Sequence, residues 1–178
     1  MEAAVIYESM YGNTHAIAQA IAQGMEPAAV PEVLSVEEAG HKDLRNIDLL
    51  VVGGPTHVHG LSRKAMREAA LQDAAEHPGK GPVPDPSAPG PGLREWFDAL
   101  EKGSGKAAAF DTRAEGPELL TGRASKTIAR KLSQHGFELL AEPASFLVSK
   151  DNRLLPGEQE RAIEWGRELA AALSPLPH

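Results

Sequence analysis

The chain has 178 residues, of which 42% are hydrophobic, and a formal net charge of -7. This length is enough for one compact domain, and the lack of cysteine excludes disulfides, thiolate metal sites and iron–sulfur clusters. The negative charge argues against a nucleic-acid partner, which needs a basic surface. No segment approaches the roughly 20 apolar residues that span a bilayer, so we expect no membrane partner and a cytoplasmic location.

Short apolar runs typical of buried strands alternate along the chain with helical segments. The runs predict strands at 3–7, 30–36, 48–53 and 106–110, and a last strand over 137–140 and 144–148 that is interrupted at Pro143. Apolar spacings of three and four predict helices at 14–25, 62–76, 93–100, 123–135 and 158–173. Strands that are apolar on both faces favour a parallel sheet with helices on both faces. At this length the common arrangement is a doubly wound α/β sheet of five strands in the order 2-1-3-4-5, which predicts one domain over residues 1–178.

Residues 78–92 (PGKGPVPDPSAPGPG) interrupt the crossover between the predicted strands 48–53 and 106–110. They include six prolines and four glycines, a composition that no helix or inner strand tolerates. The predicted helix 93–100 must run from the carboxyl edge of the sheet to its amino edge. We therefore expect the end of this segment to lie near the carboxyl edge, either as a solvated linker or as a lid or docking loop beside a ligand crevice.

Small polar residues (SMYGNT) join the first predicted strand to the first predicted helix. Open α/β sheets bind ligands at the carboxyl ends of their strands, where the strand order reverses. There the unpaired N–H groups of a helix terminus, a flexible glycine and nearby hydroxyls can bind a phosphate without lysine or arginine. The alternative is an ordinary turn with a capped helix. The candidate phosphate-binding residues are Ser9, Met10, Tyr11, Gly12, Asn13 and Thr14.

Two further segments are expected to reach the same edge of the sheet. GGPTHVHG (residues 53–60) follows the strand 48–53, and FDTRAEG (residues 110–116) follows the strand 106–110 as a loop. The sequence has neither a Walker motif nor a G-x-G-x-x-G motif, so a P-loop nucleotide or a dinucleotide is not expected. Three loops from three strands therefore converge on one predicted crevice.

These segments make the chain similar to the flavodoxins and flavodoxin-like FMN proteins. SMYGNT resembles the family's phosphate loop, T/S-x-T-G-x-T, with Tyr11 in place of the central threonine, as in the related quinone reductases. GGPTHVHG resembles the second flavin loop, and FDTRA occupies the position of the third. The resemblance extends over essentially the whole chain.

The resemblance implies a role for each segment toward bound FMN. Residues 9–14 would hold the phosphate. The second loop would run along the ring near its N5 atom, and a carbonyl within residues 57–60 would accept a hydrogen bond from N5–H of the reduced flavin. The third would flank the other face of the ring or its pyrimidine edge. The second and third loops contribute Pro55, Thr56, His57, Val58, His59 and Gly60, and then Asp111, Thr112 and Arg113.

The flavodoxin pattern of a tryptophan in the second loop and a tyrosine in the third is missing here. His57 or His59 would then cover the ring, and Tyr11 would touch the ligand from the first loop. Trp96 and Trp165 lie on predicted helices, where core packing or a place on a helix face is the expected role. Asp111 and Arg113 are interpreted either as a ligand-orienting pair or as a surface ion pair.

The resemblance favours an FMN-binding electron carrier that takes electrons from a reductase and passes them to an acceptor protein. One alternative is an enzyme that oxidises NAD(P)H and reduces a quinone, and another is a binding module of the same fold that has lost FMN. His57 and His59 also have the spacing of two metal ligands, but the sequence offers no clear third ligand, and the remaining alternative is that both are plain loop histidines. Ser9 lacks the G-x-S-x-G elbow of a hydrolase nucleophile.

Overall fold

Within residues 1–58 and 60–174, which the computed structural model describes, six strands form one sheet whose pairings are all parallel. Hydrogen-bonded neighbours follow the order β2-β1-β3-β4-β5, and β6 also pairs with β4. The doubly wound order predicted from the sequence is therefore confirmed. The strands are β1 (Ala3–Tyr7), β2 (Glu32–Ser35), β3 (Leu49–Pro55), β4 (Lys106–Ala114), β5 (Glu138–Leu139) and β6 (Ala144–Val148).

Two short strands share the fifth position of the sheet. β5 pairs with the start of β4, where Lys106 lies opposite Glu138, and β6 pairs with the end of β4, from Phe110 to Ala114. Pro143 lies between β5 and β6 and has no N–H to give to a ladder. The predicted interruption of the last strand is thus confirmed.

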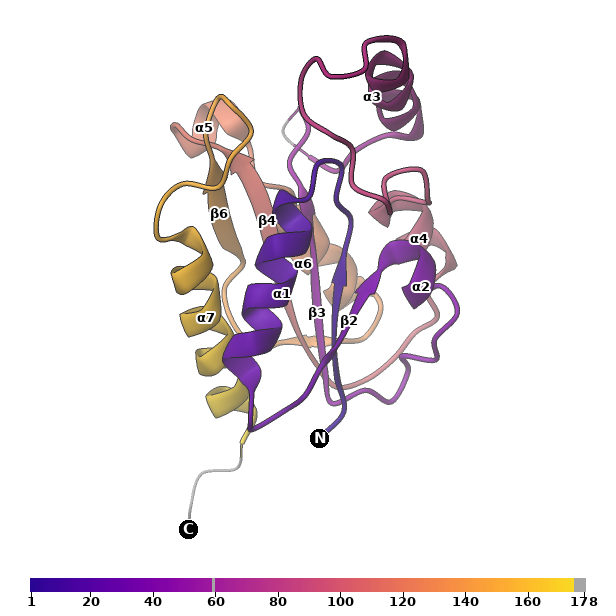
Figure 1. Ribbon diagram of the computed structural model, residues 1–178. Coiled ribbons are helices and arrows are strands. Elements are labelled where there is room, and N and C mark those ends of the chain that lie inside the picture. The colour runs from indigo at the N-terminus through magenta and orange to yellow at the C-terminus, as the bar shows by residue number, and fades with distance from the viewer. Residues whose placement is uncertain (59, 175–178) are drawn as a thin grey trace.

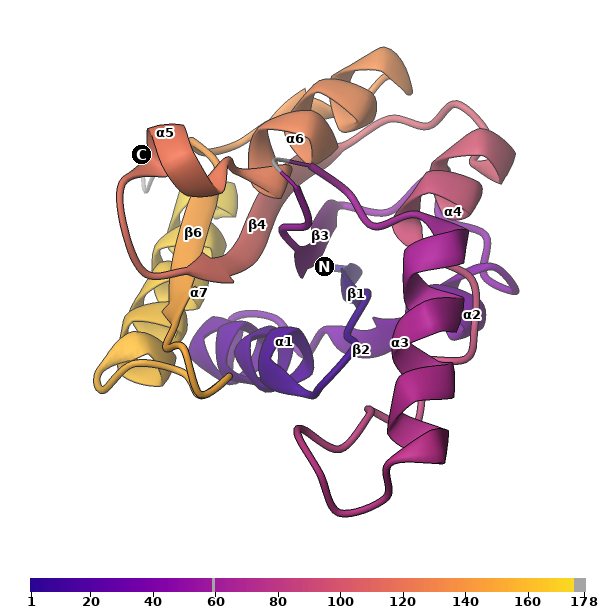
Figure 2. The same cartoon turned by 90° about the horizontal axis from the view of Figure 1, so that it is seen from above.

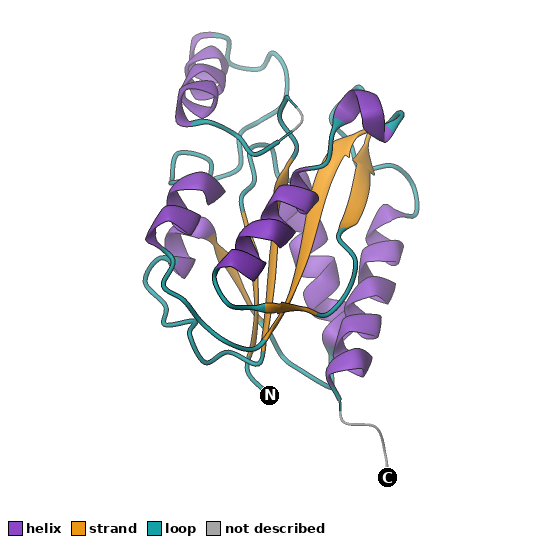
Figure 3. Ribbon diagram, turned by 180° about the vertical axis from the view of Figure 1, so that it is seen from behind, coloured by secondary structure: helices purple, strands orange, loops and turns teal. Residues whose placement is uncertain are grey.

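Helices cover both faces of the sheet. Helices α1 and α7 lie side by side over one face in Figure 1, and α4 and α6 cover the opposite face in Figure 3. Helix α2 lies beside β2 near α4. The helices are α1 (Asn13–Met25), α2 (Val36–Ala39), α3 (Lys64–Glu76), α4 (Leu93–Ala99), α5 (Glu118–Thr121), α6 (Ala124–Gln134) and α7 (Glu158–Leu173). Among the described residues, no helix has both the length and the apolar character to cross a membrane.

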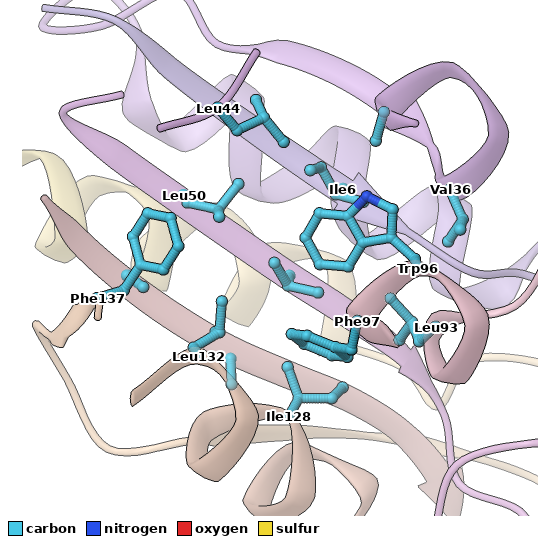
Figure 4. Close-up of a cluster of buried hydrophobic side chains, with 14 of the residues drawn as sticks. Ile6, Val36, Leu44, Leu50, Leu93, Trp96, Phe97, Ile128, Leu132 and Phe137 are labelled. Atoms are coloured by element: carbon cyan, nitrogen blue, oxygen red, sulfur yellow. The ribbon is translucent and has the colours of Figure 1, made fainter. Parts of the chain in front are cut away.

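Alternate residues of the inner strands contribute to two hydrophobic cores, one on each face of the sheet. In β3, Leu50 and Val52 belong to the core under α4 and α6, whereas Leu49 and Val51 belong to the core under α1 and α7. Figure 4 shows the first core, in which Trp96 packs. In the second core, the rings of Trp165 and Phe110 lie edge to face at 6.4 Å between centroids. Trp96 is buried, whereas Trp165 is partly buried and packs against the second core, so both side chains lie on core-facing sides of their helices, as expected.

The second predicted strand is shorter than expected because a helix begins within it. The prediction placed residues 30–36 in one strand, but β2 ends at Ser35 and α2 begins at Val36. Ser35 and Glu38 form a capping box, in which the Ser35 hydroxyl accepts from Glu38 N (3.3 Å) and the Glu38 carboxylate accepts from Ser35 N (2.7 Å). This reciprocal pair stabilises a helix start at Ser35.

The fourth strand is longer than expected, and this corrects the prediction of a loop at residues 111–113. Strand β4 continues to Ala114, so Asp111, Thr112 and Arg113 are strand residues. Thr112 pairs with Pro55 of β3 on one side and with Phe146 of β6 on the other. Because both neighbours supply ladder partners, the polar residues of this segment remain extended.

Helix α3 lies beyond the carboxyl edge of the sheet, clear of the two helical layers (Figures 1 and 2). Arg67 is its only buried residue, and Arg67 Nη1 donates to Ser62 Oγ (3.0 Å). Ser62 Oγ in turn donates to Glu8 Oε2 (2.6 Å), just beyond the end of β1. Nη2 of Arg67 donates to Glu95 Oε1 of α4. This buried polar network holds α3 to the sheet.

The end of the Pro/Gly segment (residues 78–92) lies at the carboxyl edge, as predicted. Leu93 N, directly after the segment, donates to Glu8 Oε1 (2.7 Å) at the end of β1. Val83 is 81% exposed, whereas Asp85 and Ala88 are buried. The segment is therefore a solvated linker in its first part and a packed element of the carboxyl edge in its second.

Candidate functional site

A cavity of about 210 Å³ opens at the carboxyl edge, where four segments of the chain meet. Its lining comes from the loop after β1, the loop after β3, the end of β4 and the loop after β6. A larger hollow, of about 420 Å³, is lined by residues 39–45, Trp96 and residues 99–101, away from this edge. The residues that line the cavity at the edge are Ser9, Met10, Tyr11, Asn13, Thr14, Pro55, Thr56, His57, Thr112, Arg113, Ala114, Val148, Ser149, Lys150 and Asn152.

The first loop (residues 9–14) turns sharply from β1 into α1. Gly12 has φ +93° and ψ -13°, a left-handed conformation that side chains other than glycine rarely adopt. Its N–H donates to Ser9 Oγ at 3.0 Å, which closes the turn. The hydroxyls of Thr14 and Thr112 lie 2.8 Å apart and join the first loop to β4. The loop thus presents hydroxyls and main-chain amides at one end of the cavity.

The amino terminus of α1 has no cap from its own N-cap residue. Gly12 occupies the N-cap position, no side-chain cap bond is formed, and the first turn carries no acidic residue. The first N–H groups of an α-helix have no partner within the helix and carry a partial positive charge. An anion in the cavity beside Asn13 and Thr14 would therefore meet donors that the helix itself does not use.

The second loop (residues 55–60) begins in the ladder and ends in a tight turn. Thr56 N donates to Thr112 O (2.8 Å), and His57 and Gly60 exchange two main-chain hydrogen bonds of 2.7 and 2.9 Å. Val58, at the tip, is 85% exposed and has φ +44°. A left-handed conformation is unfavourable for a β-branched residue, so this turn stores strain. His59 lies outside the described residues, and its proposed role as a ring contact or metal ligand is not tested.

His57 lines the cavity beside Pro55 and Thr56, and its side chain is half-buried. Within the described part of the chain its Nε2 atom has no hydrogen-bond partner. Burial lowers the pKa of the imidazole, the nearby Glu8 carboxylate opposes that shift, and Arg67 adds to it. The ring is therefore neutral at neutral pH, and it offers a polar atom rather than a charge to the cavity.

The third segment (residues 111–113) sends its side chains to two different places. Thr112 and Arg113 line the cavity, but Asp111 is fully buried and does not. Asp111 Oδ2 accepts a hydrogen bond from Ser125 N of α6 (2.8 Å). Arg113 Nη1 donates to Gly116 O (3.0 Å) and Thr121 Oγ1 (3.1 Å). Asp111 and Arg113 therefore hold separate partners, and neither the ligand-orienting pair nor the surface ion pair is formed.

Asp111 and Thr56 together cap the amino terminus of α6. Ala124 N donates to Thr56 Oγ1 (3.1 Å), and Ser125 N donates to the Asp111 carboxylate. Burial is the largest influence on the pKa of Asp111 and raises it, while hydrogen bonds from Ser125 and Ser145 and the charge of Arg123 oppose the rise. Unlike α1, this helix has its first N–H groups satisfied by oxygens of the protein itself.

A fourth loop (residues 149–152) completes the cavity, and it was missed in the sequence. Asn13 Nδ2 donates to Asn152 O (3.0 Å) and to Asn152 Oδ1 (3.2 Å), so this loop is joined to the start of α1. Ser149 and Lys150 also line the cavity. The loop follows the last strand of a parallel sheet, and that position alone would have indicated it, because carboxyl ends of parallel strands share one edge.

The doubly wound sheet with a cavity at the reversal of strand order defines a flavodoxin-like α/β protein. The sequence profile of the flavodoxin family matches residues 5–165. The chain belongs to the flavodoxin family.

Solved structures of flavodoxins share the fold at low sequence identity. Flavodoxin 1 from Bacillus cereus has a TM-score of 0.64 and 19% identity, covering 98% of this chain and 100% of that one. A flavodoxin from the domain Archaea has a TM-score of 0.59 and 18% identity, covering 97% and 99%. Rubredoxin oxygen:oxidoreductase from Desulfovibrio gigas has a TM-score of 0.58 and 18% identity, covering 97% of this chain and 36% of that one. A comparison with curated protein sequences gives no significant match.

Proposed function

We propose that this chain binds FMN non-covalently and carries electrons from a reductase to an acceptor protein. Members of the flavodoxin family bind a flavin, typically FMN, and pass electrons to redox partners, which supports the proposal. The observation that carries it is the uncapped amino terminus of α1, which lies beside the cavity at the carboxyl edge. The net charge of -7 suits an acidic carrier that is steered toward a basic partner.

The donors around the first loop fit a phosphate group. A phosphate dianion needs several hydrogen-bond donors and a favourable potential, and a helix amino terminus supplies both. Ser9 and Thr14 add hydroxyls, and Gly12 adopts the left-handed conformation that turns the chain from the first loop into α1. A cavity of about 210 Å³ is smaller than the 300–1,000 Å³ typical of whole-ligand pockets, so it would take the phosphate end of FMN and leave the ring more open to a partner.

The other loops would orient the flavin ring. When bound, FMN supplies the redox chemistry, since its ring takes up one or two electrons. The neutral imidazole of His57 would contact the ring without adding a charge. A carbonyl of the second loop would accept a hydrogen bond from N5–H, and the unfavourable φ of Val58 makes a rearrangement of this turn less costly. Thr112 and Arg113 would lie on the β4 side of the ligand.

The first test is the visible absorption spectrum of purified protein that has been supplemented with FMN and desalted. A flavin spectrum that persists, with a raised melting temperature, supports the proposed cofactor. The holoprotein is then titrated anaerobically with dithionite and assayed for NAD(P)H oxidation. Uptake of two electrons in separate single steps, without NAD(P)H oxidation, supports the carrier.

Two outcomes would contradict the proposal in different ways. Loss of all flavin on desalting, with no change in melting temperature, would contradict the proposed cofactor and favour a binding module that has lost FMN. Direct two-electron reduction with steady NAD(P)H oxidation would keep the cofactor but replace the carrier by an enzyme.

A further inference from the structure

One buried carboxylate of the Pro/Gly segment contacts the first loop, although more than seventy residues separate them in the sequence. Asp85 is 7% exposed, while Val83, two residues earlier, is 81% exposed. Asp85 N donates to Met10 O at 2.7 Å, which is a main-chain bond to the first loop itself. The Pro/Gly segment is therefore fixed to this loop at one residue.

The side chain of Asp85 makes a second connection, at the other end of the first loop. Asp85 Oδ2 lies 3.1 Å from Nδ1 of His15, the residue after Thr14. The ring of His15 is stacked on Tyr7 of β1, with 4.2 Å between centroids and an interplanar angle of 10°. Asp85 thus contacts both ends of the turn that Gly12 makes, and its Oδ2 atom is 4.0 Å from the position of a Cβ on Gly12.

The carboxylate is itself held in place within the segment. Asp85 Oδ1 accepts from Ser87 N (2.8 Å) and from Ser87 Oγ (2.6 Å), which forms a local turn of the kind that aspartate favours. Burial, the largest single influence, raises the pKa of Asp85, but the bonds from Ser87 and His15 together lower it below its usual value. The group is therefore ionised at neutral pH, and each of its two oxygens has a partner within the protein.

We propose that Asp85 is a positioning residue of the cofactor site, which holds the first loop in the shape that receives the phosphate of FMN. The inference rests on the proposed function, because it assigns a role toward the same ligand. A loop that is ordered before binding loses less entropy when the ligand arrives, so its anchor contributes to affinity without touching the ligand. The benefit should be confined to ligands that carry the phosphate.

The test compares the binding of FMN and of riboflavin, which lacks the phosphate, in the Asp85→Ala variant of the full chain. Loss of hydrogen bonds of this kind should weaken FMN binding about tenfold, while riboflavin binding changes less than about twofold. Asp85→Asn keeps one acceptor oxygen for Ser87 and turns an N–H toward Nδ1 of His15, which accepts in its other neutral tautomer, so it should restore FMN affinity to within about threefold of the wild type. Asp98→Ala, at an exposed position of α4, is the matched control and should change neither affinity.

Hydrogen exchange provides a readout that needs no cofactor. In the apo protein, the amides of residues 9–16 should exchange faster in Asp85→Ala than in the wild type, while those of α7 should not change. Unchanged FMN affinity would overturn the inference, as would an equal loss for both flavins or tighter FMN binding by Asp85→Asn. Wild-type protein that binds no FMN would overturn the proposed function as well, whereas wild-type binding with an unaffected Asp85→Ala variant overturns this inference alone.

Discussion

Two long helices, α1 and α6, begin at the same edge of the sheet, but their amino termini are treated in opposite ways. Helix α6 is capped from neighbouring strands, because Thr56 and Asp111 accept from its first N–H groups. Helix α1, with Gly12 at its N-cap, has no side-chain cap, and neither helix carries an acidic residue in its first turn. The protein thus uses its own carboxylate at α6 and leaves donors for an external anion at α1. Stability and ligand affinity should accordingly respond to different substitutions at the two ends.

The largest loss of FMN affinity should follow when the amino terminus of α1 receives a carboxylate of its own. In Gly12→Asp, a negative charge would stand at the N-cap of α1, between the cavity residues Tyr11 and Asn13 and with its Cβ 4.0 Å from Asp85 Oδ2. Two unit charges about 5 Å apart at an effective dielectric constant of about 20 repel by about 3 kcal/mol, so FMN affinity should fall about 100-fold or more. Fluorescence titration of FMN measures this loss.

Two variants separate the charge from the strain in that experiment. Gly12→Asn brings a similar side chain without the charge and should lose far less affinity. Gly79→Asp has a comparable backbone, with φ +78° and open space around its Cβ, and should bind FMN as the wild type does. Equal losses in Gly12→Asp and Gly12→Asn would show that shape rather than charge governs the α1 terminus.

Removing the carboxylate that caps α6 should affect folding rather than binding. Asp111→Ala leaves the N–H of Ser125 without its buried acceptor, which should cost about 2 kcal/mol of the free energy of unfolding. FMN affinity should stay within about twofold, because Asp111 does not line the cavity. Urea denaturation of the apo protein, with FMN titration of the same samples, measures both. An affinity loss as large as that of Gly12→Asp would place Asp111 in the binding site after all.

The pH dependence of stability tests the same carboxyl group. The pKa of Asp111 is raised in the folded state, mainly by burial. At a pH between the unfolded and the folded pKa, the folded protein therefore keeps a proton on Asp111 that the unfolded chain has released. Stability from this group is therefore full below the unfolded pKa, near 3.8, and falls as pH rises toward the folded pKa. Asp111→Asn cannot ionise, so its stability relative to the wild type should rise from pH 4 upward, by about 1.4 kcal/mol per unit of raised pKa. A difference in stability between the two proteins that does not change with pH would contradict the raised pKa of Asp111.

Breaking the hydroxyl pair that joins the first loop to β4 should lower FMN affinity less than Gly12→Asp does, and the free energy of unfolding less than Asp111→Ala does. Thr14→Val removes a proposed phosphate donor and leaves the hydroxyl of Thr112 without its 2.8 Å partner. We expect FMN affinity to fall about tenfold and stability by about 1 kcal/mol. Thr112→Val breaks the same bond but keeps the hydroxyl of Thr14, so it should cost similar stability and less affinity. Identical affinities of the two variants would argue against a phosphate contact by Thr14.

The fold could be predicted because its signals are local. Residues 3–7 and 158–173 have the predicted bounds, since one is a continuous apolar run and the other has clear helical periodicity. The strand character of Asp111 and Arg113 was hidden, because polar residues there are stabilised by β3, β6 and α6 rather than by their own pattern. The start of α2 at Ser35 was readable in principle from the S-x-x-E spacing of a capping box.

Part of the candidate site could be predicted, because the position of a residue after a predicted strand places it at the carboxyl edge of the sheet. All residues of the first loop except Gly12 line one cavity together with Pro55 to His57, Thr112 and Arg113, because these segments follow or end parallel strands. Asp111 turns away from this cavity, and Val58 and Gly60 are not part of its lining. Asp85 carried no signal within its Pro/Gly segment, since its role depends on contacts with residues far away in the sequence.

The smallest loss of FMN affinity is expected from the fourth loop, which contacts the uncapped amino terminus of α1 and was not predicted from the sequence. Lys150 is exposed and lines the cavity beside the α1 terminus, so its charge should attract a phosphate without being required for binding. Lys150→Glu should weaken FMN binding about three- to tenfold in low salt, and by less in 0.5 M salt, where charges at an exposed site are screened. Lys102→Glu makes the same change of charge away from the cavity, so it should reproduce only the effect of net charge. A salt-independent loss would mean that Lys150 acts through the shape of the fourth loop, and an equal loss in Lys102→Glu would mean that the affinity responds to the whole protein rather than to this terminus.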